Sequence, residues 1–240
     1  MEKVVYLLEL GSEIDRSEFN RQLLSDIPAR VSGAGGTRVQ CNLVDGAVEG
    51  ASGLRYITGA HSPDATISVW LHSAVDEFRG PIDTVIRELG ASTSACLVTE
   101  SEPLLNQVES DSVGRTPGFA QLAFLHRPER LSVGEWLDIW LNHHTRIAID
   151  TQATFGYTQN IVARWLFSDP AADGSEGIPH YDAIVEELFP EAAMVDQHAF
   201  YDSGGDDSLL NRNRSAMMNS VGMFIDLDRI DVIATSQYRF

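Results

Sequence analysis

Residues 132–160 read SVGEWLDIWLNHHTRIAIDTQATFGYTQN, a stretch that predicts one helix followed by one strand. It opens with Ser132-Val133-Gly134-Glu135, a capping box in which serine and glutamate side chains bond free backbone N–H groups at a helix start. Trp136, Trp140 and His144 then recur every four residues, so they share one helix face. Residues 155–167 are typical of a strand. The stretch therefore gathers large aromatic and titratable side chains in one helix-to-strand unit.

The first half of the chain predicts the same order of elements. Val4 to Leu10 is an apolar, β-branched run that is typical of a strand. Asp15 and Glu18 then stand at the cap and third positions of a helix start. Residues of matching character recur at a constant offset of 117 positions: Leu7 and Phe124, Asp15 and Ser132, Glu18 and Glu135, Phe19 and Trp136, Leu23 and Trp140. A register that persists from a strand into a helix indicates a tandem duplication.

The remaining elements complete this repeat. The predicted strands are residues 4–10, 38–44, 65–71 and 95–98 in the first half, and residues 119–126, 155–167, 181–189 and 230–234 in the second. The predicted helices begin at Asp15 and Pro81 in the first half, with Pro28 at or just past the end of the earlier one, and span residues 132–145 and 214–225 in the second. Loops rich in Gly, Ser, Asp and Pro separate the middle strands of each half. Each half thus follows the β-α-β-β-α-β order of a ferredoxin-like unit.

The fold class follows from the covering of apolar surface. A four-stranded sheet with both helices on one face leaves its other face bare, and that face must be shielded from water. Two such sheets can cover each other face to face, or join their edges to close a barrel. We therefore predict an α+β protein in which two ferredoxin-like repeats, residues 1–105 and 117–240, pack as an α+β barrel. Residues 100–117 are the predicted linker, and the first repeat is the degenerate one.

Composition excludes several classes of partner. The net charge is −18, with 35 acidic and 17 basic residues, which argues against nucleic acid and against an anionic membrane surface. The two cysteines, Cys41 and Cys96, each lie in an apolar run and lack the spacing of a zinc site, so buried free thiols in a reducing, cytoplasmic setting are expected. No apolar run is long enough for a membrane span, and no secretory signal is visible.

The second half resembles the EthD domain family of the dimeric α+β barrel superfamily. The residues that carry this resemblance are WLNHHT (140–145), Thr151-Gln152, FGYTQN (155–160), YDAIVEELFP (181–190) and TSQY (235–238). The resemblance implies a small, cofactor-free pocket between the first helix and the sheet of a repeat, in a family whose activity is ill-defined. This sequence departs from the family pattern at Gln237, where a glutamate is usual. The first half also has Asp26 and Ile27 where the offset would place the two histidines.

The helix carries the first candidate site residues. His144 can act as a general acid or base, because an imidazole titrates near neutral pH. The alternative is a structural histidine that bonds a backbone carbonyl at the helix end. His143 points about 100° away around the helix and is a candidate ligand contact or a surface residue. Trp140 is a candidate ligand contact or a core residue.

The strands carry the remaining candidates. Tyr157 and Gln159 share one strand face, and Asn160 lies on the opposite face. Tyr157 could donate a hydrogen bond to a carbonyl or phenol oxygen, whereas a half-buried structural tyrosine is the alternative. Glu186 and Glu187 are adjacent in a strand and point to opposite faces. Of these two, Glu186 is the predicted ligand contact in the region between the sheets, where desolvation raises the pKa of a carboxyl and suits it to proton transfer.

Three functions remain open on this sequence. The first is a small-molecule protein that binds a ring-bearing or polyketide-like metabolite in an apolar cleft, with cofactor-free proton-transfer or oxidative chemistry based on His144 and Tyr157. The second is a non-catalytic binding or assembly protein, in which the histidine is structural. The third is a haem-handling protein with His143 or His144 as axial ligand. No cofactor or metal is assigned, the expected partner is a small-molecule ligand, and a homodimer remains open. No nucleophile elbow, zinc motif or dinucleotide fingerprint is present.

Overall fold

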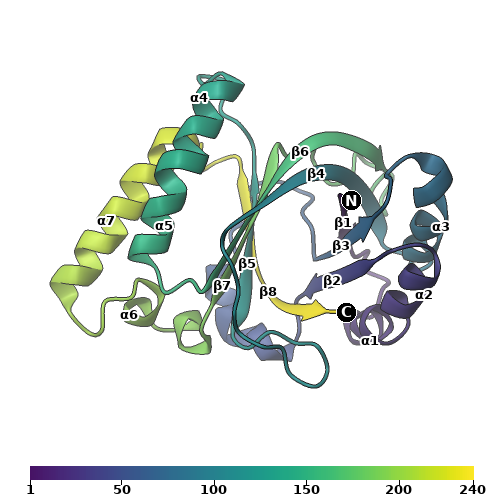
Figure 1. Cartoon of the computed structure of the whole chain (residues 1–240), viewed down its shortest axis with the longest axis horizontal. Helices are drawn as coiled ribbons and strands as arrows, with labels where there is room; N and C mark the ends of the chain where they lie inside the picture. The colour runs from purple at the N-terminus through teal and green to yellow at the C-terminus, as the bar shows by residue number, and fades with distance from the viewer.

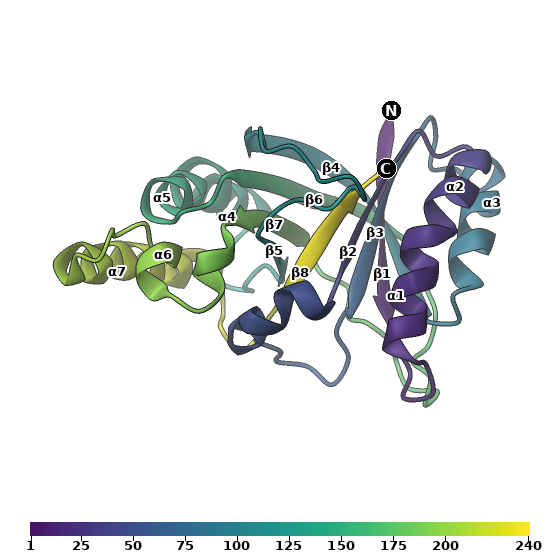
Figure 2. The ribbon, with the colours of Figure 1, turned by 90° about the horizontal axis from the view of Figure 1, so that it is seen from below.

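The computed structural model describes residues 1–240 and confirms the predicted α+β barrel. Eight strands close into one barrel in the order β1-β3-β2-β8-β5-β7-β6-β4, with the helices outside it in two groups (Figures 1 and 2). The strands are β1 (Glu2–Glu9), β2 (Arg38–Leu43), β3 (Ala65–Leu71), β4 (Ser92–Leu104), β5 (Phe119–Leu125), β6 (Gly156–Ser168), β7 (Ala183–Phe189) and β8 (Ile230–Arg239). The helix-to-strand order repeats in the two halves as β-α-β-β-α-β.

The helices flank the barrel on opposite sides (Figure 2). The first group is α1 (Arg16–Ser25), α2 (Ile27–Gly33) and α3 (Asp76–Arg87). The second group is α4 (Val133–Asp138), η2 (Ile139–His144), α5 (Thr145–Thr151), α6 (Gln197–Phe200) and α7 (Asp207–Phe224). Short 3₁₀ segments η1 (Gly46–Leu54) and η3 (Glu191–Met194) lie in the connections. None of these helices combines the length and apolar character that crossing a membrane requires.

Each half arranges its four strands in the same way. The first half has the order β4-β1-β3-β2 and the second half the matching order β8-β5-β7-β6. The halves join at two antiparallel seams, β2 with β8 and β4 with β6. Closure at both seams removes every free sheet edge, so a homodimer would have to use another surface. The descent of the halves from one duplicated unit stays a prediction.

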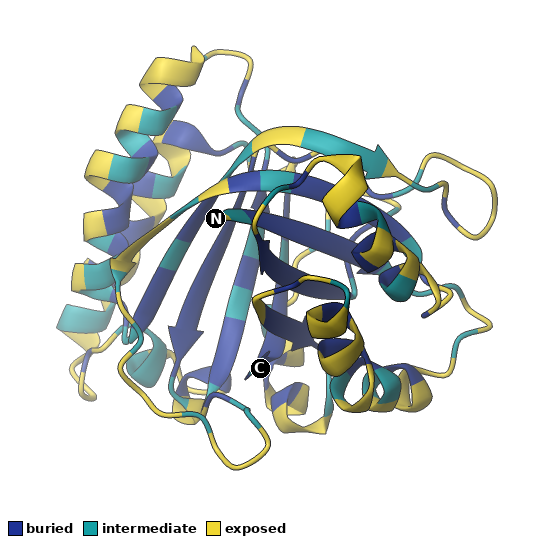
Figure 3. Cartoon of the chain, turned by 45° about the vertical axis from the view of Figure 1, so that its right-hand side comes forward, coloured by how far each residue is buried: buried dark blue, intermediate teal, exposed yellow.

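The two faces of the strands have different neighbours. Val5 and Leu7 of β1 point into the barrel, where they share an apolar cluster with Leu122 and Phe124 of β5. These are the residues that the 117-position offset relates to each other. The opposite face of each sheet packs under its own helices. The strands are accordingly buried along most of their length (Figure 3).

The two helix starts predicted from caps, at Asp15 and Ser132, are confirmed. The Asp15 carboxylate accepts a 2.8 Å hydrogen bond from the Glu18 backbone N–H. Ser132 and Glu135 form the reciprocal capping box, with a 3.3 Å bond to the serine hydroxyl and a 2.9 Å bond to the glutamate carboxylate. A cap can be read from sequence because all of its atoms lie within one turn.

Some predicted boundaries are wrong. Pro28 does lie past the end of α1, but it stands in the first turn of a second helix, α2, that was not predicted. The second helix of the first repeat begins at Asp76, so Pro81 lies inside this helix. Its N-cap residue, Val75, makes no side-chain hydrogen bond, so the sequence contains no capping motif that would predict this start. Strands β4 and β8 are longer than predicted because each continues along a seam with the other half. Local sequence patterns cannot predict such a contact between distant segments.

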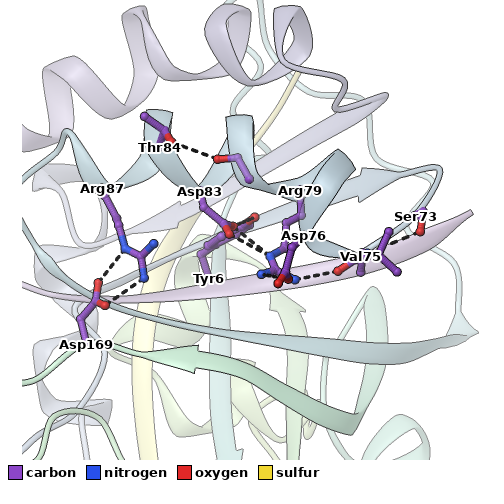
Figure 4. Close-up of polar contacts among 11 residues, drawn as sticks. Tyr6, Ser73, Val75, Asp76, Arg79, Asp83, Thr84, Arg87 and Asp169 are labelled. Carbon is purple, nitrogen blue, oxygen red and sulfur yellow. Dashed lines mark hydrogen bonds and ion pairs between the residues drawn. The ribbon is translucent and has the colours of Figure 1, made fainter.

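The layer between the helices and the sheet of the first repeat is mainly apolar and contains one buried polar cluster (Figure 4). The Tyr6 hydroxyl donates a 2.8 Å bond to the Asp83 carboxylate. The Arg79 guanidinium donates to both Asp83 oxygens at 3.1 and 2.9 Å and to the Ala74 carbonyl oxygen. Burial raises the pKa of Tyr6, and the neighbouring Asp83 carboxylate raises it further. These groups satisfy one another, in contrast to the equivalent layer of the second repeat.

Candidate functional site

The second repeat encloses a cavity of about 250 Å³ between its helices and the outer face of its sheet. Helices η2 and α7 form one wall, and strands β5, β6, β7 and β8 form the other. The lining is mainly apolar. It comprises Leu54, Tyr56, Gln121, Ala123, Leu125, Trp140, His144, Gln152, Tyr157, Val185, Glu187, Phe200, Tyr201, Met217, Met218, Val221, Phe224, Ile225, Leu227, Ile230 and Val232. A mainly apolar cavity with a few polar groups is typical of a small-molecule site.

The rim of this cavity combines both halves of the chain. Tyr56, Met218 and Leu227 are each about half exposed at 50%, 47% and 49%, so the rim presents apolar side chains to solvent. The Tyr56 hydroxyl donates a 2.9 Å bond to the Leu227 carbonyl oxygen, and Tyr56 also pairs with Val232 of β8. The segment after η1 of the first repeat therefore covers the pocket of the second.

A π-helical turn sets the direction of the helix side chains. Residues Ile139–His144 form this turn, and the Thr145 backbone N–H bonds to the Trp140 carbonyl oxygen five residues earlier. A π-turn adds about one residue to the usual 3.6 of an α-helix, and such turns are frequent at functional sites. Both His144 and Thr145 are consequently buried, whereas His143 is exposed. The π-turn interrupts the α-helix expected over residues 132–145, but Trp140 and His144 still share the buried face that their four-residue spacing predicts.

His144 is a neutral side chain in this environment. Its Nδ1 atom lies 2.9 Å from the Ser220 hydroxyl, and its ring centroid lies 4.6 Å from that of Phe224 on α7. Burial lowers the pKa of His144 to about 4, and the neighbouring His143 lowers it as well. The expectation that His144 titrates near neutral pH is therefore wrong.

Glu187 is the titratable group of the cavity. It stands directly across from Tyr157 on β6 and from Gln121 on β5, so the three side chains form one row on the outer face of the sheet. Its Oε1 atom is buried without a hydrogen-bond partner, and Oε2 accepts only a 3.4 Å bond from the Gln121 amide. Burial raises the pKa of Glu187 to about 7. This carboxyl therefore exchanges its proton near neutral pH.

Tyr157 supplies a hydroxyl beside this carboxyl. It is 1% exposed, and its oxygen accepts a 3.4 Å bond from the Trp140 indole N–H. Burial raises the pKa of Tyr157, and the negative charge of Glu187 raises it further. The phenol thus stays protonated at neutral pH and can donate a hydrogen bond. The Gln152 Oε1 atom is a second buried acceptor of the lining without a partner.

The structure brings together Trp140, His144 and Tyr157 from the predicted set. Gln159 lies outside the cavity and donates a 2.7 Å bond to the Thr145 hydroxyl, which ties helix to sheet. Asn160 and Glu186 point into the barrel instead. The Asn160 amide bonds the Ile184 carbonyl oxygen at 3.3 Å.

Glu187, rather than Glu186, is the carboxyl in the cavity. The sequence indicates that the two glutamates face opposite ways, but which of them faces the helices depends on the register of β7 with β5 and β6. That register is a non-local property. No group of three or more His, Cys, Asp or Glu side chains in the structure is placed to hold a metal ion.

We predict that Glu187 makes stability fall as pH rises. Its folded pKa of about 7 lies above the ordinary value of 4.5, so its contribution is full below pH 4.5 and is lost as pH rises through 7. At about 1.4 kcal/mol per pH unit, the loss is roughly 3 kcal/mol. Glu187→Gln should therefore gain roughly that much free energy of unfolding over wild type between pH 4.5 and pH 8, as measured by urea denaturation.

Because His144 also titrates, the effect of Glu187 must be measured as the difference in stability between Glu187→Gln and wild type. The lowered pKa of His144 gives the opposite slope, with stability lost as pH falls from 6.5 through about 4, so the two slopes partly cancel in the wild-type profile. The exposed Glu191 provides a control, since Glu191→Gln should shift stability equally at both pH values. An equal difference between Glu187→Gln and wild type at pH 4.5 and pH 8 would contradict the buried-carboxyl assignment.

Solved structures show the same fold at low sequence identity. The chain matches no known family model and no curated protein, so the resemblance to the EthD family is not shown. An anthrone oxidase-like protein superimposes with a TM-score of 0.56 at 10% identity, covering 100% of this chain and 91% of that one. A candidate monooxygenase from Fusobacterium nucleatum superimposes with a TM-score of 0.50 at 9% identity, covering 99% and 91%. At these identities the similarity establishes the α+β barrel fold alone.

Proposed function

We propose that this protein binds a compact, ring-bearing ketone or phenol in the cavity of the second repeat and moves a proton of that ligand. The observation that carries the proposal is Glu187, a buried carboxyl with a near-neutral pKa and an unpartnered oxygen, next to Tyr157 in a mainly apolar cavity. Strongly perturbed carboxyls in such surroundings are candidates for acid–base catalysis.

The proton moves from carbon, or from a phenol, to Glu187. The ionised carboxylate takes the proton of a C–H next to a ring carbonyl, so the C–H bond breaks and an O–H bond forms on the carboxyl. The electron pair shifts onto the carbonyl oxygen as an enolate. Tyr157, a neutral phenol, donates a hydrogen bond to that oxygen, and the surrounding apolar side chains strengthen the interaction by excluding water.

His144 has a supporting role in this proposal. At a pKa of about 4 the ring is neutral at pH 7, so it does not compete with Glu187 for the ligand's proton. Its contact with Ser220 connects the π-turn to α7 and thereby holds the cavity walls together.

Two similarities support the choice of a ring-bearing ligand. The resemblance of residues 140–160 and 181–190 to EthD domains implies a small cofactor-free pocket at this place. One structural neighbour of the same fold is named for anthrone, a fused-ring ketone with an acidic methylene group. A cavity of about 250 Å³ lies just below the ~300–1,000 Å³ range of ligand pockets and therefore suits a compact, planar molecule.

Filling the cavity tests the binding part of the proposal. Ala123 lies on β5 in the cavity wall, so Ala123→Phe should weaken the binding of anthrone at least tenfold, measured by quenching of tryptophan fluorescence. Ala29→Phe, on the exposed surface of α2, adds the same ring elsewhere and should leave the affinity unchanged. Equal affinities of wild type and Ala123→Phe would remove the cavity as the binding site.

A further inference from the structure

The interior of the barrel has an apolar end and a polar end. The apolar end holds the cluster that includes Val5, Leu7 and Phe124. The polar end lies where β8 finishes and β2 begins, and it contains a cavity of about 180 Å³ that opens at the mouth of the barrel. Its lining is dominated by charged and amide side chains: Arg38, Gln40, Glu100, Glu102, Leu104, Asn106, Gly156, Thr158, Glu186, Leu188, Gln237 and Arg239. This barrel-mouth cavity is distinct from the pocket under the helices.

The strands themselves separate the two cavities. Tyr157 and Glu187 form a cross-strand pair on the outer face of β6 and β7, whereas Thr158 and Glu186 form the next pair on the inner face. A ligand in the barrel mouth would therefore lie one sheet thickness from the outer pocket.

The carboxylates of the barrel mouth are largely satisfied without its arginines. Glu186 accepts bonds from the amides of Gln40 at 2.9 and 3.1 Å, Asn42 at 2.7 Å and Gln237 at 2.7 Å. Glu100 forms a 2.6 Å ion pair with Lys3 and accepts a 2.8 Å bond from an indole N–H. Glu102 is exposed to solvent.

Arg38 and Arg239 therefore lack a direct carboxylate partner. They lie close together at the β2–β8 seam, and neither forms an ion pair with a carboxylate, in a chain of net charge −18. Arg38 stacks with its guanidinium carbon 3.5 Å from the centroid of the Trp70 ring, which fixes its plane. Burial lowers the pKa of Arg239 and the charge of Arg38 lowers it as well, whereas the negative charges of Glu186 and Glu102 raise it.

The unmet hydrogen-bonding groups are donors. The Arg239 Nε atom and the Asn106 side-chain nitrogen are both buried and lack a partner, and both residues line this cavity. A buried donor left without an acceptor costs free energy. The Arg239 Nη2 donates a 3.1 Å bond to the Thr116 hydroxyl, so its Nε is the N–H group left for a ligand. Guanidinium N–H groups suit the oxygens of a carboxylate or phosphate group.

We propose that the barrel mouth is a binding site for a small oxyanion, the carboxylate or phosphate group of a compact molecule, held by Arg38 and Arg239. The oxygens of the ligand accept from the Arg239 Nε and from Asn106. Arg38, oriented by Trp70, supplies the second positive charge. The negative charge of Glu102 at the mouth weakens the site.

Binding of inorganic phosphate and of acetate tests this site. Calorimetric titration of the full chain, at constant ionic strength set with sodium chloride, should give saturable binding of at least one of the two anions. Arg38→Gln and Arg239→Gln should each weaken that binding about tenfold or more, because charge-assisted bonds are lost. Glu102→Gln should tighten it. Arg146→Gln removes an arginine whose side chain is 84% exposed on α5 and should leave the affinity unchanged.

The outcomes separate the possible ligands. Saturable binding of phosphate alone identifies a phosphate-bearing ligand, and binding of acetate alone identifies a carboxylate. Arg38 is exposed, so its variant keeps the fold and remains informative even if Arg239→Gln is unstable. The proposal is overturned if neither anion binds saturably, or if Arg38→Gln binds as tightly as wild type.

Discussion

Replacing Glu187 by glutamine is expected to slow proton abstraction from anthrone by about 10²–10⁴-fold, the contribution typical of a positioned general base. The amide keeps the size of the side chain but cannot accept the proton. The exchange of the anthrone methylene hydrogens for deuterium is measured by NMR in D₂O at neutral pD. The exchange rate in buffer alone is subtracted from the rate with protein. The affinity for anthrone should change far less than the exchange rate, because the cavity keeps its shape.

The pH dependence of that exchange identifies the base. The ionised carboxylate is the reactive form, so the rate should rise with pH and level off above about 7, the value to which burial raises the pKa of Glu187. Glu191→Gln removes an equal charge at an exposed position two residues beyond the end of β7 and should keep the wild-type profile. Wild-type exchange in Glu187→Gln would refute the role of Glu187. Binding of anthrone without any exchange above buffer would favour the non-catalytic alternative.

Much of the fold could be predicted because its signals are local and occur twice. The pairs Leu7 with Phe124 and Asp15 with Ser132 come from matching positions of the two halves, and each pair has the same role in the structure. Leu7 and Phe124 both point into the barrel. The Asp15 and Ser132 side chains each accept a hydrogen bond from a backbone N–H at a helix start. Barrel closure followed from the need to cover the bare face of each sheet, which is a property of any such sheet.

The site was harder to predict because its geometry depends on contacts between distant segments. The π-turn places His144 against Ser220 of α7, a partner that no spacing within residues 132–160 could indicate. The choice between Glu186 and Glu187 depends on how three strands align. The sequence could therefore indicate the elements that build the pocket, together with Trp140 and Tyr157, but not the carboxyl at its centre.

The second large effect is expected in the first repeat, where replacement of the buried Asp83 should lower the free energy of unfolding. In the first repeat this carboxylate accepts bonds from both Tyr6 and Arg79 in the buried helix-to-sheet layer (Figure 4). Asp83→Ala would leave the buried Tyr6 hydroxyl without its acceptor, and would leave the buried Arg79 guanidinium only the Ala74 carbonyl oxygen and the exposed Asp76 as partners. Removal of one partner of a buried ion pair costs about 3–5 kcal/mol, so the free energy of unfolding should fall by about that amount in urea denaturation.

Asp76 is a matched control for this loss, because it pairs with the same arginine on the same helix. Its carboxylate lies 2.8 Å from the Arg79 guanidinium, but its side chain is 93% exposed, whereas that of Asp83 is 8% exposed. Solvent screens an exposed pair, so Asp76→Ala should cause only a small fraction of the loss seen for Asp83→Ala. Equal losses would mean that Arg79 is held by charge alone and not by burial. The buried contacts of Asp83 with Tyr6 and Arg79 would then contribute no more to stability than one exposed ion pair.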